Sequence, residues 1–452
     1  MAAEKGVIKD PSLFSITWPL FIEISLHMSL GILATLILSH YSDNAVAGVG
    51  VSNQVLNLFI LVFNVTAVGT TILVGQSIGA ERIDRARRLS KSSFGVNFWV
   101  GIIITVFVFV FGEMLLRFYG LEGAVHIYAL TFLKITSISL FLEALSLVLG
   151  SILRSYGYTK ETMVVTVLMN LISVTGNYIS VTGAFGFPVT GVTGVAWSIV
   201  IARLFAVLAL MILVYKILAL KFEVKDVFNI PLQDVRDILS IGLPSAGENL
   251  SYHISQIVIT GFVATLGAAA LSARVYILNI SMVCFLFSTA IAQGTQLLVA
   301  RYIGSQQFDR AFKRGMHTLK LAMIVSFAVS LFIALIGRPI LEIFTENETI
   351  IAIALPVLWA IVFIEPGRAM NLVLMGSLKS AGDVRFPVVI GVICMWGVAV
   401  VFSYFLGLKI GLGLLGVWIA QGFDEWIRGL FAVRRWKAQT WRKKLVNEGL
   451  QV

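Results

Sequence analysis

The stretches VGQSIGAERIDRARRLSKSSF at residues 74–94 and VARYIGSQQFDRAFKRGMHTL at residues 299–319 decide the fold, because each repeats the pattern of the other. Both end an apolar run, carry Ile-Gly followed by Asp-Arg-Ala, and finish with a cluster of basic residues. The first begins at Val74 and the second at Val299, so they are separated by almost half of the chain. A pattern that returns after half a chain predicts two structurally equivalent halves.

The composition predicts a membrane protein. The chain is 58% hydrophobic and 13% charged, with a mean hydropathy of +0.92, whereas soluble domains carry about 25% charged residues. Cys284 and Cys394 both lie in apolar runs, and we interpret them as small core residues rather than a disulfide or a metal pair. We expect no metal and no cofactor apart from a coupling ion, H+ or Na+.

Apolar segments long enough to span a bilayer, which takes about 20 residues, occur twelve times along the chain. The sequence therefore predicts an all-α polytopic membrane protein with twelve transmembrane helices. The two opening stretches are expected to form loops after the second and the eighth span. The spans are residues 14–39, 47–78, 92–116, 124–152, 162–184, 190–219, 236–266, 270–300, 316–337, 348–376, 385–407 and 411–433.

The basic residues predict how the spans are oriented. Counted over alternate connections, 27 Lys and Arg residues lie on the side of the N-terminus, seven of them in the C-terminal tail, and three lie on the opposite side. Because basic residues concentrate in cytoplasmic loops, both termini are expected in the cytoplasm. The formal net charge of +10 follows from this topology, so no nucleic-acid partner is expected. The tail RRWKAQTWRKKLVNEGLQV mixes tryptophan with basic residues and is expected to lie along the inner membrane surface.

The offset between the opening stretches holds well beyond them. We expect an N-lobe of residues 1–225 with the first six helices, and a C-lobe of residues 226–452 with the other six and the basic tail. Because an even number of spans separates the copies, the two lobes share one orientation, and a cleft between them suits alternating access by a transporter. The matched positions include Pro19 with Pro244, Glu23 with Glu248, Arg154 with Lys379, Ser155 with Ser380, Gly157 with Gly382, Glu143 with Arg368, and Arg203 with Arg428.

Ionisable residues inside membrane spans are costly and are therefore candidate functional groups. Glu23 and Glu248 each follow a proline within a span by four residues, beside an expected helix bend. Structural alternatives exist for every candidate: a solvated carboxylate near the membrane edge, a hydrogen-bonded histidine, or an ion pair that only stabilises the fold. The candidates for ion coupling are Glu248, Glu365, Glu23, His27 and His253.

A second group of polar residues in the spans could line the cleft. Their side chains could contact a substrate, or could instead join neighbouring helices by hydrogen bonds. Glu365 and Arg368 are three residues apart on one helix and are expected to pair. The cleft candidates are Arg368, Glu143, Asn64, Asn177, Asn249, Asn279, Asn371, Arg203 and Arg274.

Five further patterns follow one another in the chain: VAGVGVSNQ (46–54), VGQSIGAERIDRARR (74–88), GAFGFPVTGVTGVAWS (183–198), GLPSAGENLSY (242–252) and SLKSAGD (377–383). In this order, with twelve spans and the repeat, the chain resembles the MATE (multidrug and toxic compound extrusion) transporters of the MOP flippase superfamily. The resemblance covers Pro19 to Arg435 and implies two six-helix bundles in a V shape. It also implies export of cationic, often aromatic compounds in exchange for H+ or Na+.

The chain departs from the family at the acidic positions. The resemblance implies aspartates in the first, fifth and tenth spans and a glutamate in the seventh, and this chain has other residues there. The expected coupling site therefore shifts to Glu248, Glu365, and Glu23 with His27. The departing positions are Ala34, Asn177, Arg368, and either Ser251 or Tyr252.

The function expected from the sequence is secondary active export of a cationic, amphipathic small molecule by antiport with H+ or Na+. The chain has no G-x-x-x-x-G-K-[ST] motif for ATP. The alternative is a flippase-like exporter of a lipid-linked or anionic metabolite, which Arg203, Arg274 and Arg368 keep open. A membrane-embedded enzyme lacks a catalytic constellation, and the order G-x-x-x-D-R-x-G of major-facilitator transporters is absent from residues 79–91. We expect a monomer in the plasma (inner) membrane of a prokaryote.

Overall fold

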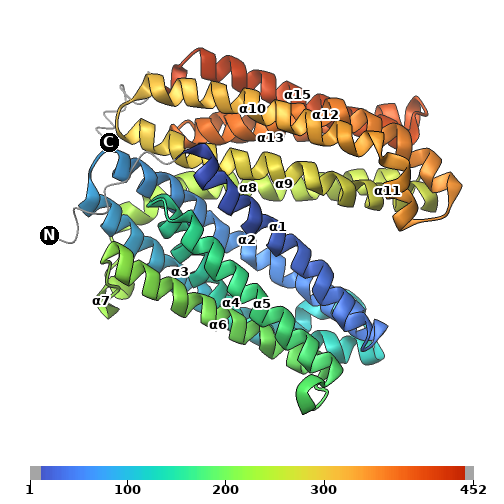
Figure 1. The fold of residues 1–452 in the computed structure, drawn as a ribbon, viewed down its shortest axis with the longest axis horizontal. Helices are drawn as coiled ribbons and strands as arrows, with labels where there is room; N and C mark the ends of the chain where they lie inside the picture. The colour runs from blue at the N-terminus through green and yellow to red at the C-terminus, as the bar shows by residue number, and fades with distance from the viewer. Residues whose placement is uncertain (1–11, 443–452) are drawn as a thin grey trace. The chain divides into compact units, whose positions relative to one another are not determined.

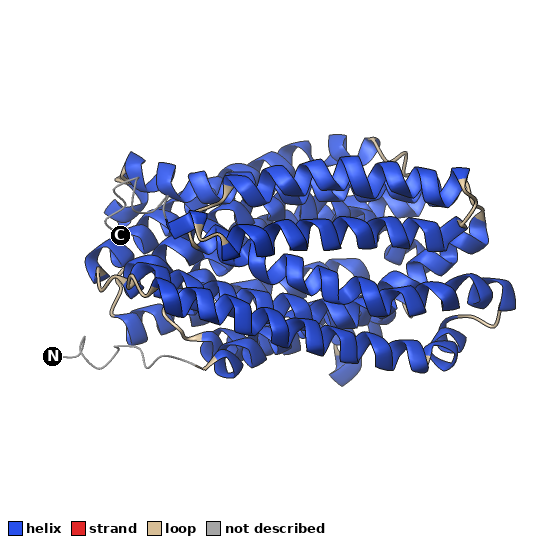
Figure 2. Ribbon diagram, turned by 90° about the horizontal axis from the view of Figure 1, so that it is seen from above, coloured by secondary structure: helices blue, strands red, loops and turns tan. Residues whose placement is uncertain are grey.

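The computed structural model describes residues 12–442, and this part of the chain is helical with no strand (Figure 2). The helices are α1 (Leu13–Ser39), α2 (Asp43–Gly79), α3 (Ile83–Arg117), α4 (Gly123–Ser155), α5 (Thr159–Thr182), η2 (Ala184–Gly186), α6 (Gly191–Leu218), α7 (Val224–Phe228), α8 (Leu232–Ala264), α9 (Ala268–Gly304), α10 (Phe308–Leu335), α11 (Gly337–Phe344), α12 (Glu348–Ser380), α13 (Arg385–Cys394), η3 (Met395–Val400), α14 (Val401–Tyr404), η4 (Phe405–Lys409) and α15 (Gly413–Lys437).

The predicted all-α polytopic fold is confirmed. Among the described residues, ten helical segments are long and apolar enough to cross a membrane. The seventh and twelfth predicted spans lie in α8 and α15, helices of 33 and 25 residues that carry more charge. The eleventh span is one run from Arg385 to Lys409, in which the π-helical segments η3 and η4 interrupt the α-helix.

The helix boundaries repeat with the offset of the sequence. α2 and α9 are both 37 residues long, and their first and last residues are matched positions of the repeat. α4 and α12, each of 33 residues, correspond in the same way. Glu81 and Gln306, another matched pair, are both non-glycine residues with positive φ, at 59° and 57°. The two halves therefore share their turns as well as their helices.

The prediction that the basic stretches form loops after the second and eighth spans was wrong. α2 ends at Gly79 and α3 begins at Ile83, while α9 ends at Gly304 and α10 begins at Phe308. The Asp-Arg-Ala segments thus lie in the first turns of helices, where Asp84 and Asp309 interact favourably with the helix N-termini. α3, with 35 residues, is longer than the hydrocarbon core requires, so its basic first turns can extend beyond the membrane.

The described chain forms two compact units. Unit 1 consists of residues 12–78 and 82–243, and unit 2 of residues 79–81 and 244–442. The change between them falls inside α8 at Pro244, whereas the lobe boundary predicted between residues 225 and 226 lies within α7, which packs on α3 in unit 1.

Unit 1 is a bundle in which α4 and α6 pack together, α3 lies against α4, and α5 joins α6 to α1 (Figure 1). Small residues allow close approach between α2 and α4, because a Cβ on Gly48 would lie 2.9 Å from the backbone nitrogen of Ala129. Ser52 adds a hydrogen bond, since its Oγ donates to the carbonyl of Ala129 at 2.9 Å. Large buried side chains such as Phe63 and Phe132 fill the space around this contact.

Unit 2 is organised around α12, which packs against α9, α10 and α15 (Figure 1). Its apolar core includes Ile277 of α9, Val357 of α12 and Trp418 of α15. The position of α12 matters for the polar site described below, because a helix enclosed by three neighbours holds its central side chains away from lipid.

The described part of the C-terminal tail packs into unit 2 through its tryptophans. Trp436 and Trp441 are fully buried and stack with ring centroids 4.8 Å apart. Gly315 of α10 makes room for them, because a Cβ there would lie 2.9 Å from Nε1 of Trp436. The rest of the predicted tail, residues 443–452, lies outside the described residues.

Two turn glycines test the repeat. Gly157 and Gly382 follow α4 and α12 with φ of 95° and 81°, a region where a Cβ costs about 1–2 kcal/mol. We expect Gly157→Ala and Gly382→Ala each to lower the Tm of the purified protein in detergent. Gly376→Ala is the control, because Gly376 lies within α12 with nothing within 4 Å of an added Cβ. Equal Tm values for all three variants would contradict the strained turns.

Candidate ion-coupling site

Glycines bring α12 and α15 close together at the centre of unit 2. A Cβ on Gly367 would lie 2.7 Å from the Trp426 ring, and a Cβ on Gly422 would lie 2.7 Å from Ile364. Trp426 also donates its Nε1–H to the carbonyl of Phe363 at 2.8 Å, near the helix proline Pro366. Close backbones let short polar side chains of the two helices reach each other.

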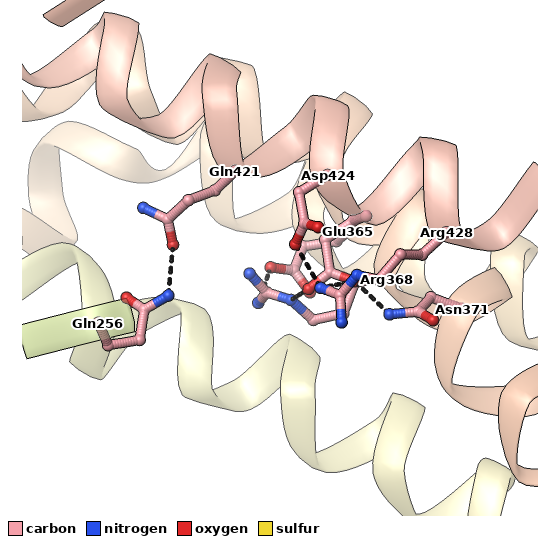
Figure 3. A network of polar contacts seen from close by, with 8 residues as sticks. Gln256, Glu365, Arg368, Asn371, Gln421, Asp424 and Arg428 are labelled. Carbon is pink, nitrogen blue, oxygen red and sulfur yellow. Dashed lines mark hydrogen bonds and ion pairs between the residues drawn. The ribbon is translucent and has the colours of Figure 1, made fainter. Parts of the chain in front are cut away.

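These helices hold a cluster of charges that we call the carboxylate cluster: Glu365, Arg368, Asp424, Glu425 and Arg428. Arg368 donates to Glu365 at 2.5 Å and to Glu425 at 3.3 Å. Arg428 pairs with both Asp424 and Glu425, the latter at 3.3 Å. Figure 3 shows these charged groups gathered between the two helices. The predicted Glu365–Arg368 pair is confirmed, and it is one edge of a larger network.

Asn371 completes the cluster. Its Nδ2 donates to Oε2 of Glu425 at 2.7 Å, so Glu425 accepts from Arg368, Arg428 and Asn371. Asn371 and every residue of the carboxylate cluster except Arg368 are more than nine-tenths buried. The side chain of Arg368 is 19% exposed. A buried carboxylate with three donors is held firmly in its charged form.

The other two carboxylates are less well satisfied. Oε2 of Glu365 and Oδ1 of Asp424 are buried without a hydrogen-bond partner. With every group ionised, the cluster holds three negative and two positive charges, so one carboxylate has no counter-charge. An unpaired buried carboxylate is strongly disfavoured unless it takes up a proton or binds a cation.

Unit 1 has only a simple pair at the equivalent place. Arg203 of α6 pairs with Glu143 of α4 at 2.9 Å and donates to Ser139 at 2.6 Å. In unit 2 the position of Glu143 is occupied by Arg368, so two arginines meet where unit 1 has one. Unit 2 has three acids near its two arginines, Glu365 on α12 and Asp424 and Glu425 on α15, so one negative charge is in excess.

Glu23 and Glu248 form the same ion pair in both units. Glu23 pairs with Arg154 at 2.8 Å and Glu248 pairs with Lys379 at 2.6 Å, each joining the first long helix of its half to the fourth. The acidic side chains are 19% and 14% exposed. Each of these pairs is balanced in charge, unlike the carboxylate cluster, and this suits a structural role. Oε2 of Glu23 is buried without a hydrogen-bond partner, as is Oε2 of Glu365.

A matching hydrogen bond lies beside each pair. Ser155 donates to the carbonyl of Thr71 at 3.3 Å, and Ser380 donates to the carbonyl of Gln296 at 3.0 Å. The fourth helix of each half is therefore tied to the first and to the second helix in the same way. This agreement extends the repeat from backbone to side chains.

The histidines and the other asparagines do not join the carboxylate cluster. His253 is exposed and contacts the ring of Tyr252, while His27 is exposed on α1. Asn64 and Asn279 each donate to the carbonyl four residues earlier in their own helix. Asn249 is exposed, and Asn177 is buried with its Oδ1 unpartnered.

Arg274 lies apart from the cluster in a second polar contact of unit 2. Its Nη2 donates to Oε1 of Gln256 at 2.9 Å, and Nε2 of Gln256 donates to Oε1 of Gln421 at 3.3 Å. The guanidinium lies 5.3 Å from the ring centroid of Trp418. We call Arg274, Gln256 and Gln421 the amide chain.

Sequence reasoning missed Asp424, Glu425, Gln256 and Gln421, and it matched Arg428 with Arg203 without taking it as a candidate. The polar residues of α15 follow spacings of three and four residues, which places them on one face of the helix. That spacing inside an apolar span was the signal available in the sequence.

The chain is similar to transporters over nearly its whole length. A model of the MatE family matches residues 19–179 and 244–405. An uncharacterized transporter of Bacillus subtilis, YisQ, is 44% identical over 98% of this chain and 97% of that protein. A probable multidrug resistance protein NorM of Thermotoga maritima is 26% identical over 96% of this chain and 93% of its own length.

Solved structures show the same fold. An outward-facing multidrug resistance MATE family transporter of the MOP superfamily aligns with a TM-score of 0.87 at 19% identity, covering 98% of this chain and 99% of that one. A MOP superfamily transporter of Pyrococcus furiosus aligns with a TM-score of 0.86 at 19% identity, covering 94% and 95%. Its binding pocket is described as reversed in polarity, suggesting a different function for that protein.

Glu425 should be the most important acid for stability. Glu425→Gln replaces one acceptor oxygen among the donors Arg368, Arg428 and Asn371 by an NH2 group, and a buried donor left without an acceptor costs about 1–3 kcal/mol, or more where the donor is charged. We expect a large fall in Tm in detergent. Glu342→Gln is the control, because Glu342 forms an exposed pair with Arg338 that contributes at most about 1 kcal/mol. A Glu425→Gln protein as stable as Glu342→Gln would show that the cluster does not hold α15 to α12.

Charge reversal tests the repeated pairs. Glu248→Lys alone places two cations together, and Lys379→Glu alone places two carboxylates together, so each should lower the Tm. The double variant restores an ion pair and should recover most of the loss, with a coupling energy of about 1–3 kcal/mol. The same cycle at Glu23 and Arg154 should behave alike. Additive losses in both double variants would show that these residues do not interact.

Proposed function

Because the chain belongs to the MATE family, whose members are transporters and not enzymes, we propose that it exports small molecules by antiport, driven by H+ or Na+ at Glu365 and Asp424. It is a multi-pass membrane protein with bacterial relatives. The observation that carries the proposal is the excess carboxylate of the cluster, with its buried unpartnered oxygens on Glu365 and Asp424.

A proton or a sodium ion would each remove this imbalance. A proton on Glu365 or Asp424 leaves two carboxylates against two arginines. A sodium ion would use oxygen ligands from the same two side chains, since carboxylates suit hard cations. Either ion would be bound in one state and released in another, which is what coupling to a transport cycle requires. Glu248 and Glu23 act in this proposal as structural partners of Lys379 and Arg154.

The proposed substrate is a cationic, amphipathic molecule. Relatives of this chain carry the description of probable multidrug resistance proteins, and this supports a broad substrate range. The described units also expose large apolar and aromatic side chains, such as Tyr178, Tyr252 and Trp396, some of which could contact aromatic compounds. The predicted setting, the inner membrane of a prokaryote with both termini in the cytoplasm, gives export as the direction.

The alternative is export of an anionic or lipid-linked metabolite. Of the three arginines that could bind such a substrate, two are already paired with acids. Arg203 is paired with Glu143, and Arg368 with Glu365 and Glu425, so neither offers a free positive charge. Arg274 has no such partner among the described residues. The alternative therefore depends on Arg274 alone.

The antiport is tested with the full-length protein in liposomes that contain a fluorescent cationic dye. We expect efflux to follow an imposed pH gradient or an imposed Na+ gradient, and the effective gradient identifies the coupling ion. Glu365→Gln and Asp424→Asn each remove a carboxylate without changing its shape, so gradient-driven efflux should fall to the level of empty liposomes. Dye binding measured without a gradient should persist.

Glu143→Gln is the matched control, since Glu143 is a span carboxylate paired in unit 1 with no unpartnered oxygen among the described buried atoms. It should keep its gradient dependence even if it loses stability. If Glu365→Gln and Asp424→Asn both transport like the unmodified protein, the coupling site lies elsewhere. If no gradient drives any cationic dye while the protein binds none, the proposed substrate class is wrong.

A further inference from the structure

Arg274 is a buried cation without a counter-charge. It is 3% exposed, and no carboxylate within the described residues pairs with it. Its Nη2 is bound by Gln256, but its Nη1 is buried with no partner. Isolating a charge from water in this way costs several kcal/mol unless an opposite charge or strong acceptors compensate.

Arg274 also determines the direction of every hydrogen bond in the amide chain. A guanidinium only donates, so Gln256 must turn its oxygen toward Arg274. Its nitrogen must then face Gln421, which accepts with its own oxygen. The nitrogen of Gln421 is left at the end of the chain, buried and without an acceptor. Figure 3 shows this nitrogen pointing away from the carboxylates of Asp424 and Glu365.

Both ends of the amide chain are therefore donors that lack an acceptor. One end carries a full positive charge at Arg274, and the other is the Nε2–H group of Gln421. A partner that satisfies Arg274 has acceptor atoms and a negative charge. The neighbouring carboxylates do not serve, because no hydrogen bond or ion pair links Arg274 to Asp424, Glu425 or any other acid of the described chain.

We propose that unit 2 contains an anion site at Arg274, which binds a monovalent anionic group: a halide ion or the carboxylate of an organic molecule. The unpartnered edge of the guanidinium matches a single charge with one or two acceptor atoms. Trp418 stacks on the guanidinium at 5.3 Å and supplies an aromatic wall. This site is separate from the carboxylate cluster and does not depend on the proposed antiport.

A water molecule would satisfy the same hydrogen bonds but not the charge. Its lone pair can accept from Nη1, yet the cation remains uncompensated in a medium of low dielectric. An anion satisfies both requirements. The difference can be measured, because only an anion makes stability depend on the identity and concentration of the anion.

The test is thermal unfolding of the full-length protein in detergent. Sodium chloride, sodium acetate and sodium benzoate are each titrated in exchange for sodium sulfate at constant ionic strength. We expect a saturable rise in Tm of about 2–5 °C with at least one of them. An effect of chloride alone identifies an inorganic ion, and a stronger effect of benzoate identifies an organic carboxylate as the ligand.

Two variants decide whether the effect belongs to this site. Arg274→Met removes the cation, and Gln256→Glu places a carboxylate beside it, so both should lose the anion-dependent shift. Gln256→Glu should in addition reach, without added anion, the Tm that the unmodified protein reaches with it. The paired substitution Glu143→Gln with Arg203→Met is the control, because it removes a largely buried arginine and its partner in unit 1 and should keep the shift.

The proposal is overturned if no anion produces a saturable shift in the unmodified protein. It is equally overturned if the shift persists in Gln256→Glu, even where Arg274→Met does not fold. Neither result bears on antiport, because no gradient and no transported dye enter the experiment. A failed coupling test with Glu365→Gln would likewise leave the anion site unaffected.

Discussion

A charged side chain inside a membrane is stable only when an opposite charge in the same helical bundle lies beside it. This requirement determines many of the contacts between the helices of this structure. Lipid offers no counter-ion and no hydrogen bond, so an unpaired ion is expensive. Arg203 has Glu143, Arg154 has Glu23 and Lys379 has Glu248. The pairs join different helices, and so the need to neutralise charge also fixes which helices touch. At the carboxylate cluster and at Arg274 the pairing is incomplete, and a purely structural role does not explain these unpaired charges.

The comparison of the two units separates architecture from specialisation. The pairs of Glu23 and Glu248, with the serine bonds beside them, occur twice and hold the first, second and fourth helices of each half. The charges around Arg368 and Arg428 occur only once in that form within the described residues. A duplicated fold can keep one copy as a support while the other acquires new groups. Unit 1 holds the balanced pair of Glu143 and Arg203, and unit 2 holds the unbalanced set.

The sequence predicts the repeat, the twelve spans and the Glu365–Arg368 pair because each depends on spacing along the chain. It does not predict the contact of Gln256 with Gln421, since these residues are far apart in sequence and meet only through the packing of α8 on α15. The acids beside Arg428 were missed for a different reason: α15 continues to Lys437, and its basic end resembles a tail. The burial of Trp436 and Trp441 was not predicted, because a composition of tryptophan and arginine does not distinguish an interfacial segment from a packed one.

In the proposed antiport, the single excess carboxylate also limits the energy that a transport cycle can use. If the cluster takes up one monovalent cation for each substrate released, the exchange of a singly charged drug moves no net charge. The membrane potential, which is worth about 2.3 kcal/mol per elementary charge at 100 mV, then contributes nothing. Only the concentration gradient of the ion remains, so a tenfold ion gradient, about 1.4 kcal/mol, sustains at most a tenfold substrate gradient. A transporter built this way lowers the internal level of a toxic compound modestly, and it works best where the compound enters slowly.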